Sequence, residues 1–154
     1  VGEGFKMAMM ALDGGRLSIG TCSVGAAHRC LHLARDHVQV RKQFGKPLSA
    51  NQSVQFKLAD MATDVVTARQ MVRHAAKLLD EADPMARSHC AMAKRVATDL
   101  GFKVCNEALQ LHGGYGYLQS YPVERYMRDT RVHTILEGTN EIMRVIIARS
   151  LLEQ

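Results

Sequence analysis

The sequence lacks any apolar run long enough to cross a bilayer, and no signal-peptide pattern opens it. Aromatic residues make up only 5% of the 154 residues, and they do not alternate with the 20 Lys and Arg residues, which are scattered along the chain. Nucleic-acid-binding proteins concentrate their cations on one surface, often with aromatic side chains. The sequence therefore predicts neither membrane insertion nor a nucleic-acid partner. Local cations can still bind a phosphate-bearing ligand.

Cysteine is also scarce. Cys22, Cys30, Cys90 and Cys105 lie far apart, with no Cys-x-x-Cys pair and no matched pair of histidines. A zinc site needs such ligands at close spacing, so we expect no metal site. The cysteines lie mostly among small apolar residues of helical segments, which predicts buried free thiols in a reducing compartment.

Strand and hairpin patterns are missing throughout the sequence. Apolar residues instead recur every three or four positions along three long segments, which is the pattern of amphipathic helices. These helices are predicted at about residues 17–38, 51–83 and 85–111.

Shorter helices are predicted between and beyond the long ones. Residues 5–12 are expected to form a separate helix that ends at Asp13-Gly14-Gly15, and residues 123–128 to form another. A last helix is predicted to start at Thr139, whose hydroxyl can accept a hydrogen bond from an unpaired amide of the first turn.

The predicted fold is all-α, an antiparallel up-and-down four-helix bundle that occupies residues 1–154 as one domain. A coiled coil is the alternative, but the short loops let neighbouring helices pack within the chain. Helix faces that stay apolar would then bury against other domains or subunits.

The turns between the helices carry residue types that a plain bundle does not need. Arg41 can donate two hydrogen bonds to a phosphate, and Phe44 in a polar turn suits a partner surface or a flat ligand. Gly113 and Gly114 fit a helix C-cap, but they also fit a close approach of the backbone to a phosphate or a ring. Glu137 precedes a helix start, where most glutamates face solvent and interact with the helix dipole.

At the level of whole segments, the chain resembles the C-terminal helical domain of the acyl-CoA dehydrogenase family, and the resemblance covers its full length. The resembling segments, in order, are Val1-Gly2-Glu3-Gly4-Phe5, Arg41-Lys42-Gln43-Phe44-Gly45-Lys46-Pro47-Leu48, Asn51-Gln52, Leu58-Ala59-Asp60-Met61, Leu109-Gln110-Leu111-His112-Gly113-Gly114-Tyr115-Gly116-Tyr117, Tyr126-Met127-Arg128-Asp129 and Ile135-Leu136-Glu137-Gly138-Thr139-Asn140-Glu141.

The resemblance implies a flavoenzyme that oxidises an acyl-CoA to its trans-2-enoyl-CoA and passes electrons to electron-transferring flavoprotein. Glu137 occupies the place of the family's catalytic base, which removes the proton next to the thioester carbonyl. Some members carry the base before an arginine of the first long helix. Here that position is Gly15, before Arg16, which leaves Glu137 as the candidate. Ile135 and Leu136 are expected to give Glu137 an apolar surrounding that a bound acyl chain completes.

The resemblance also implies contacts with FAD and with the substrate. Several of the cofactor contacts would reach a flavin held mainly by a neighbouring subunit, within a homotetramer. Asp13, Arg16 and Gly138 match substrate-binding positions. The cofactor-binding positions are matched by Arg41, Gln43, Phe44, Asn51, Gln52, Gln110, Gly113, Gly114, Thr139 and Glu141.

The family's N-terminal helical domain and middle β-domain have no counterpart in the sequence. We therefore expect this chain alone to bind FAD weakly, if at all, and to be inactive. Within the family, the sequence most resembles isobutyryl-CoA and other short or branched-chain dehydrogenases. An acyl-CoA oxidase and a non-catalytic helical oligomerisation module on the same scaffold remain alternatives. The resemblance implies the cytoplasm for a bacterial protein, or the mitochondrial matrix for a eukaryotic one.

Overall fold

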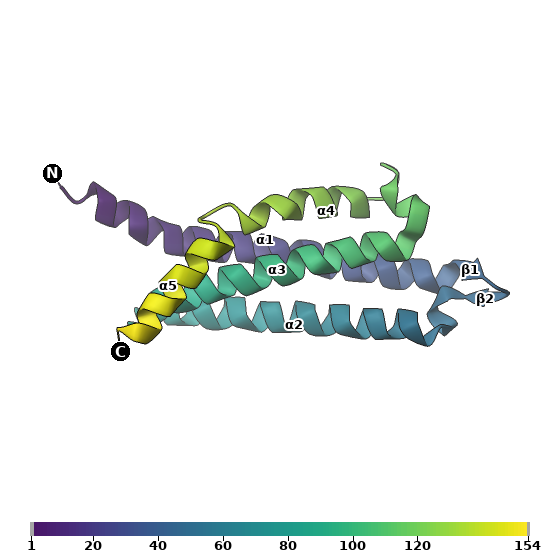
Figure 1. The fold of residues 1–154 in the computed structure, drawn as a ribbon, viewed down its shortest axis with the longest axis horizontal. Helices are drawn as coiled ribbons and strands as arrows, with labels where there is room; N and C mark the ends of the chain where they lie inside the picture. Colours follow the sequence, from purple (N-terminus) through teal and green to yellow (C-terminus); the bar gives the residue numbers. More distant parts are fainter. Residues whose placement is uncertain (1, 154) are drawn as a thin grey trace.

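The computed structural model describes residues 2–153, and Val1 and Gln154 lie outside the described residues. Four helices alternate in direction along the molecule, and a fifth crosses one end of the bundle (Figure 1). Short 3-10 turns connect several of them. The helices are α1 (Gly4–Val40), α2 (Gln52–Asp80), α3 (Ala86–His112), α4 (Val123–Arg131) and α5 (Asn140–Leu152). The 3-10 turns are η1 (Leu48–Ala50), η2 (Gly113–Tyr117) and η3 (Val132–Thr134). The predicted all-α bundle is confirmed.

Helix α3 is the centre of the bundle, because it packs against α1, α2, α4 and α5. Small side chains on its buried faces, such as Ala93, Ala97 and Ala108, let the other helices approach closely. Helix α3 comes close to α1 at Gly101, where an added Cβ would lie only 2.9 Å from the Cβ of Ser23.

The first helix differs from the prediction. Residues 5–12 are not a separate helix but the first turns of α1, which continues through Asp13, Gly14 and Gly15 for 37 residues in all. A glycine inside a helix costs only about 1 kcal/mol relative to alanine, so a pair of glycines does not by itself end a helix. The predicted break was therefore wrong.

A small hairpin was also missed. Strands β1 (Lys42–Gln43) and β2 (Lys46–Pro47) pair antiparallel across Phe44 and Gly45. Both turn residues have positive φ, 52° for Phe44 and 78° for Gly45, as a two-residue hairpin turn requires. The turn residues are Phe44-Gly45 instead of the usual Asn-Gly or Asp-Gly, and phenylalanine rarely takes this conformation. The hairpin was therefore not predictable from the sequence.

The other helices lie close to their predicted ranges, with α2 ending three residues early and α4 three residues late. All four cysteines are free, but only Cys30, Cys90 and Cys105 are buried; Cys22 is exposed, against the prediction. Among residues 2–153, no helix combines the length and the apolar character that a membrane span requires.

Candidate functional site

Glu137 lies in a tight turn between η3 and α5. Its φ is 56° and that of Gly138 is 91°, so two successive residues have left-handed backbone conformations. Such a conformation is uncommon for a glutamate and tends to persist only where the surrounding structure holds it. Immediately after the turn, the hydroxyl of Thr139 accepts a hydrogen bond from the backbone amide of Ile142 at 3.4 Å, which confirms Thr139 as the N-cap of α5.

The predicted substrate-binding residues meet at this turn. The Nε of Arg16 on α1 donates to the backbone carbonyl of Glu137 at 3.4 Å. The same guanidinium donates through Nη1 to Oδ1 of Asp13 at 2.6 Å. Arg16 is only 4% exposed, so it connects α1 to the turn from within the structure.

The carboxylate of Glu137 occupies space that Gly15 leaves open. A Cβ added to Gly15 would lie 2.5 Å from Oε2 of Glu137 and 2.8 Å from its Cδ. The position where other family members are expected to carry their base is thus adjacent in space to Glu137, although 122 residues separate the two in sequence (137 minus 15). Gly15 therefore gives the carboxylate its place on the surface of α1.

The residues before Glu137 are only partly enclosed by this chain. Ile135 is 52% exposed and Leu136 is 41% exposed. The apolar surrounding expected for Glu137 stays a prediction.

Beneath the turn lies a polar cluster that the sequence did not predict, made of the buried residues Lys94, Thr98 and Asn140 and the partly exposed Asp99. The Nζ of Lys94 donates to the carbonyl of Gly138 and to Oδ1 of Asn140, at 2.8 Å in each case. The Nδ2 of Asn140 donates to Oγ1 of Thr98 at 2.9 Å and to Oδ1 of Asp99 at 2.7 Å.

Lys94 is completely buried, and desolvation, the largest influence, lowers its pKa to about 8 against the attraction of nearby carboxylates. One signal in the sequence points to this residue. Lys94 lies four residues after buried Cys90 and three before buried Ala97, on the inward face of α3, where a lysine needs a polar partner.

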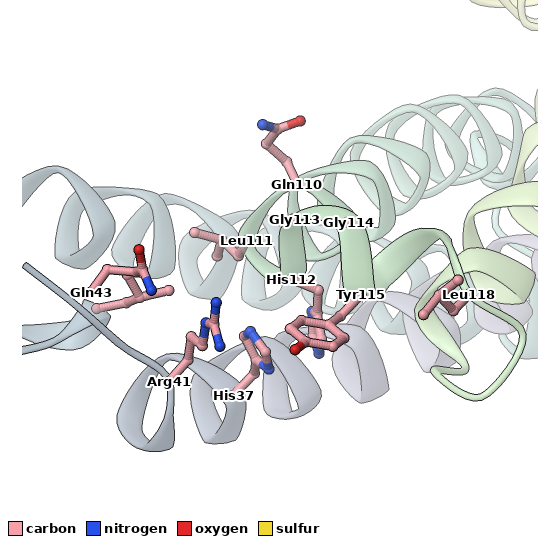
Figure 2. A pocket seen from close by; sticks show the side chains of 11 residues that line it. His37, Arg41, Gln43, Gln110, Leu111, His112, Gly113, Gly114, Tyr115 and Leu118 are labelled. Atoms are coloured by element: carbon pink, nitrogen blue, oxygen red, sulfur yellow. The ribbon is translucent and has the colours of Figure 1, made fainter.

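A second group of predicted residues lines a groove of about 520 Å³ at the opposite end of the bundle. Figure 2 shows side chains from the end of α1 and the end of α3 converging on it. Five of the predicted cofactor-binding residues line this groove: Arg41, Gln43, Gln110, Gly113 and Gly114.

Aromatic and imidazole rings form one wall of this groove. The guanidinium of Arg41 lies 5.3 Å from the ring centroid of Tyr115, within cation–π distance. His37 stacks on His112 with their centroids 4.3 Å apart, and burial lowers the pKa of His37. The Nδ1 of His112 lies 2.7 Å from the carbonyl of Ala108, which fixes the ring.

Gly113 is compatible with both roles considered for the glycine pair, a helix C-cap and a close approach of the backbone to a ligand. It is the C-cap of α3, with φ 60° and ψ −142°, a backbone conformation that side chains disfavour. A Cβ added to Gly113 or to Gly114 would meet no atom within 4 Å, so both glycines border open space. The backbone here can come close to a phosphate or a flat ring.

The remaining cofactor candidates are divided between the two ends. At the groove end, Phe44 is 96% exposed at the hairpin tip, Asn51 donates to the carbonyl of Leu48 at 3.0 Å, and Gln52 begins α2. At the other end, Thr139 and Glu141 line a separate pocket of about 370 Å³ beside the Glu137 turn.

The two ends are too far apart to contact the same part of one ligand. Arg16, at the Glu137 turn, and Arg41, at the groove, are 25 residues apart on the same helix (41 minus 16). A rise of 1.5 Å per residue places them roughly 37 Å apart along α1. In Figure 1, α5 and the hairpin lie at opposite ends of the bundle.

Comparison with known proteins identifies the family. Residues 2–152 match the acyl-CoA dehydrogenase C-terminal domain. The chain belongs to the acyl-CoA dehydrogenase family. One relative, the mitochondrial isobutyryl-CoA dehydrogenase of Dictyostelium discoideum, is 59% identical over 150 residues, which are 97% of this chain and 36% of that protein.

Solved structures of acyl-CoA dehydrogenases share the fold. The butyryl-CoA dehydrogenase of Megasphaera elsdenii superposes with a TM-score of 0.95 at 46% identity, over 98% of this chain and 39% of that one. An acyl-CoA dehydrogenase of Bacillus anthracis, solved in complex with FAD, gives a TM-score of 0.92 at 30% identity, over 99% of this chain and 29% of that one. The chain therefore spans between 29% and 39% of the length of these three relatives.

No group of three or more His, Cys, Asp or Glu side chains within residues 2–153 is arranged to hold a metal ion.

Proposed function

We propose that this chain is the C-terminal domain of a flavin-dependent acyl-CoA dehydrogenase, with Glu137 as the catalytic base. The observation that carries the proposal is the placement of the Glu137 carboxylate over Gly15, in a left-handed turn whose backbone is held by Arg16. A carboxylate that reacts with a carbon acid must be aimed within hydrogen-bond reach of the proton it removes. A side chain free in solvent would have no such direction.

In the proposed reaction, the Glu137 carboxylate accepts the proton from the carbon next to the thioester carbonyl and becomes a neutral acid. FAD, when bound, supplies the hydride acceptor for the next carbon, so a trans-2-enoyl-CoA is formed. Gly138 would lie beside the thioester, and Asp13 with Arg16 would bind the CoA portion. Arg16 also donates a hydrogen bond to the Glu137 carbonyl.

The groove at the hairpin end offers contacts for part of a dinucleotide such as FAD. Arg41 supplies a planar cation for a phosphate, Gln43 and Gln110 supply amides, and Gly113 and Gly114 leave room for close backbone contact. The distance between this groove and Glu137 supports the proposal that each copy of the domain contacts two flavins. One would lie at its Glu137 end, and the other, held mainly by a neighbouring subunit, would lie at its groove end.

This arrangement requires more protein than the chain contains. We propose that the domain, residues 1–154, functions together with an N-terminal helical domain and a middle β-domain, in a homotetramer. Phe44, 96% exposed, and the exposed side chains of Ile135 and Leu136 are then covered by neighbouring domains or subunits. The isolated chain would be inactive, because it carries the base without most of the pocket.

The proposed substrate is a short or branched acyl-CoA, with isobutyryl-CoA as the first candidate, on the basis of the relative's name. The proposed electron acceptor is electron-transferring flavoprotein. In a eukaryote the location would be the mitochondrial matrix, as the same name suggests, and in a bacterium the cytoplasm.

Two alternative functions make different demands on the site. An acyl-CoA oxidase would use the same base but pass electrons to oxygen, and a non-catalytic oligomerisation module would need no base at residue 137. The retained Glu137, Arg41 and Gln110 favour an enzyme over the module.

The test compares the intact protein, with all three proposed domains, as wild type and as Glu137→Gln. Under anaerobic conditions, isobutyryl-CoA should bleach the wild-type flavin, and the variant should bleach at least about a thousandfold more slowly, as loss of an essential base allows. Equal bleaching in both would refute the assignment of Glu137. Rapid turnover with oxygen alone would identify an oxidase, and no bleaching with any acyl-CoA would favour the module.

A further inference from the structure

The turn that carries Glu137 is held by two helices, and the contact from α3 has no assigned role in the reaction. From α1, Nε of Arg16 donates to the Glu137 carbonyl at 3.4 Å. From α3, Nζ of Lys94 donates to the next carbonyl, that of Gly138, at 2.8 Å. The two cations thus hold successive peptide groups of a turn whose backbone is left-handed at both residues.

We propose that Lys94 is a positioning residue for the proposed dehydrogenation: its buried ammonium fixes the Glu137–Gly138 turn and so aims the Glu137 carboxylate. The inference rests on the proposed function for its catalytic consequence. The structural part, that Lys94 holds this turn, stands on the hydrogen bonds alone.

The other hydrogen bonds around Lys94 also hold the segment that contains the turn. Its second hydrogen bond, to Oδ1 of Asn140, holds the first residue of α5, so one ammonium fixes both sides of Thr139. The amide of Asn140 is in turn fixed by Thr98 and Asp99, both on α3. Helix α3, the most enclosed element of the bundle, thereby sets the position of the turn through side chains rather than through the backbone of the loop.

Stability alone does not account for a cation at this place. Burying an ammonium costs several kcal/mol, and well-packed apolar residues often stabilise a core as much as or more than buried charges. Lys94 is completely buried among small residues of α3, where an apolar side chain would be the usual occupant. A long donor that reaches the Gly138 carbonyl gives what an apolar side chain cannot, which is a fixed backbone conformation beside the base.

The strain in the turn adds a second reason. A left-handed glutamate costs on the order of 1–2 kcal/mol, so without its carbonyl anchors the turn should relax toward ordinary backbone angles. Rotation at Gly138 would move the Glu137 side chain away from Gly15. A displacement of about 1 Å at a reacting group can cost on the order of a hundredfold in rate.

The test uses the intact FAD-loaded protein with Lys94→Met, which keeps the length of the side chain and removes the charge and the donors. Lys103→Met is the matched control, because Lys103 lies on the same helix but binds Asp64 at the surface, at 2.8 Å. Backbone amide hydrogen exchange is measured by mass spectrometry for residues 136–140, and kcat and KM are measured separately with isobutyryl-CoA.

We expect faster exchange in residues 136–140 of Lys94→Met and unchanged exchange in α2. We also expect kcat to fall roughly a hundredfold, with KM and flavin content within about threefold of the wild type; a general loss of structure would change all of these together. Lys103→Met should resemble the wild type in every measurement.

Unchanged exchange at the turn, or faster exchange with full kcat, would overturn the proposal. If Lys94→Met does not fold, Asn140→Ala carries the same measurements, because it removes one of the two acceptors of Lys94 and the link to Asp99. If the wild type itself oxidises no acyl-CoA, the proposed function fails, while the exchange comparison still decides whether Lys94 holds the turn.

Discussion

At the scale of single residues, the site depends on a side chain that is missing. Gly15 lies in the interior of α1, where alanine is usually favoured, yet the Glu137 carboxylate fills the place of its Cβ. The atoms that a Cβ would meet belong to the flexible end of the Glu137 side chain, so the carboxylate can move aside at little cost in stability. What should change instead is the direction in which the Glu137 carboxylate points.

Gly15→Ala should therefore separate activity from stability. We expect acyl-CoA-dependent flavin reduction in the intact protein to slow by one to two orders of magnitude, roughly the penalty for a small displacement of a reacting group. Thermal stability should stay the same or rise, because alanine is the better helix former. Gly14→Ala is the control, since its Cβ would meet nothing within 4 Å. Equal rates for the two variants would show that the carboxylate does not need this space.

The buried lysine gives an expectation for stability against pH. The pKa of Lys94 is about 8 in the folded protein and about 10.4 in an unfolded chain. Between these values the unfolded state binds more protons, so the free energy of unfolding contributed by this group rises with pH. Its destabilising effect is full below pH 8 and disappears above about pH 10.4.

This effect is measured by urea denaturation of the wild type and of Lys94→Met at pH 7 and at pH 9.5. The contributions of the other titrating groups cancel when the unfolding free energies of the two proteins are subtracted at each pH. We expect the difference in unfolding free energy to shift by about 2 kcal/mol in favour of the wild type at the higher pH. A pH-independent difference would mean that Lys94 titrates near its ordinary value.

At the scale of helices, the contact between α1 and α3 decides how the site is held. Both helices are hydrogen-bonded to the segment between α4 and α5, α1 through Ser23 and α3 through Lys94. Oγ of Ser23 lies 2.8 Å from Nδ1 of His133 in η3, and Lys94 binds the Gly138 carbonyl. A change in the spacing between α1 and α3 would therefore move the segment that carries Glu137.

Gly101→Ala tests this spacing. An added Cβ would lie 2.9 Å from Cβ and 3.1 Å from the backbone carbonyl oxygen of Ser23, which cannot swing away as a flexible side chain would. We expect the free energy of unfolding of the 154-residue chain to fall by about 1–3 kcal/mol in urea denaturation, the usual cost of overpacking. Gly25→Ala, which lies in α1 and meets nothing within 4 Å, should stabilise the chain slightly. Equal effects would mean that the helices can separate without penalty.

At the scale of the whole molecule, the predicted cofactor residues lie at two ends of one bundle. Arg41 and Gln110 line the groove near the hairpin, while Thr139 and Glu141 lie beside Glu137. If each flavin site takes one end from one copy and the other end from another copy, two different defects can be complemented within a mixed oligomer.

Co-expression of intact proteins that carry Arg41→Ala and Glu137→Gln should therefore restore part of the activity that each variant lacks alone. For random pairing of two copies, about a quarter of the sites would have both ends intact, which sets the upper limit. Glu137→Gln with Gly15→Ala is the control pair: both changes lie at the same end, so mixing should add nothing. Mixed oligomers with no recovered activity would show that one copy supplies both ends of each site.

Local physics made several features predictable from the sequence alone. Apolar periodicity determined the three long helices, and the hydroxyl of Thr139 determined where α5 begins. The motifs around Glu137 and Gly113 identified the family through their resemblance. These features depend on residues near one another in the chain, which is why the sequence contains their signal.

Tertiary structure decided what depends on distant parts of the chain. The contact of Arg16 on α1 with the carbonyl of Glu137 joins two residues that are far apart in the sequence. The space that Gly15 leaves for Glu137, and the hydrogen bond from Lys94 to Gly138, each join residues more than 40 positions apart. A sequence records which side chains can donate, accept or leave room, but only the packed helices decide which of them meet.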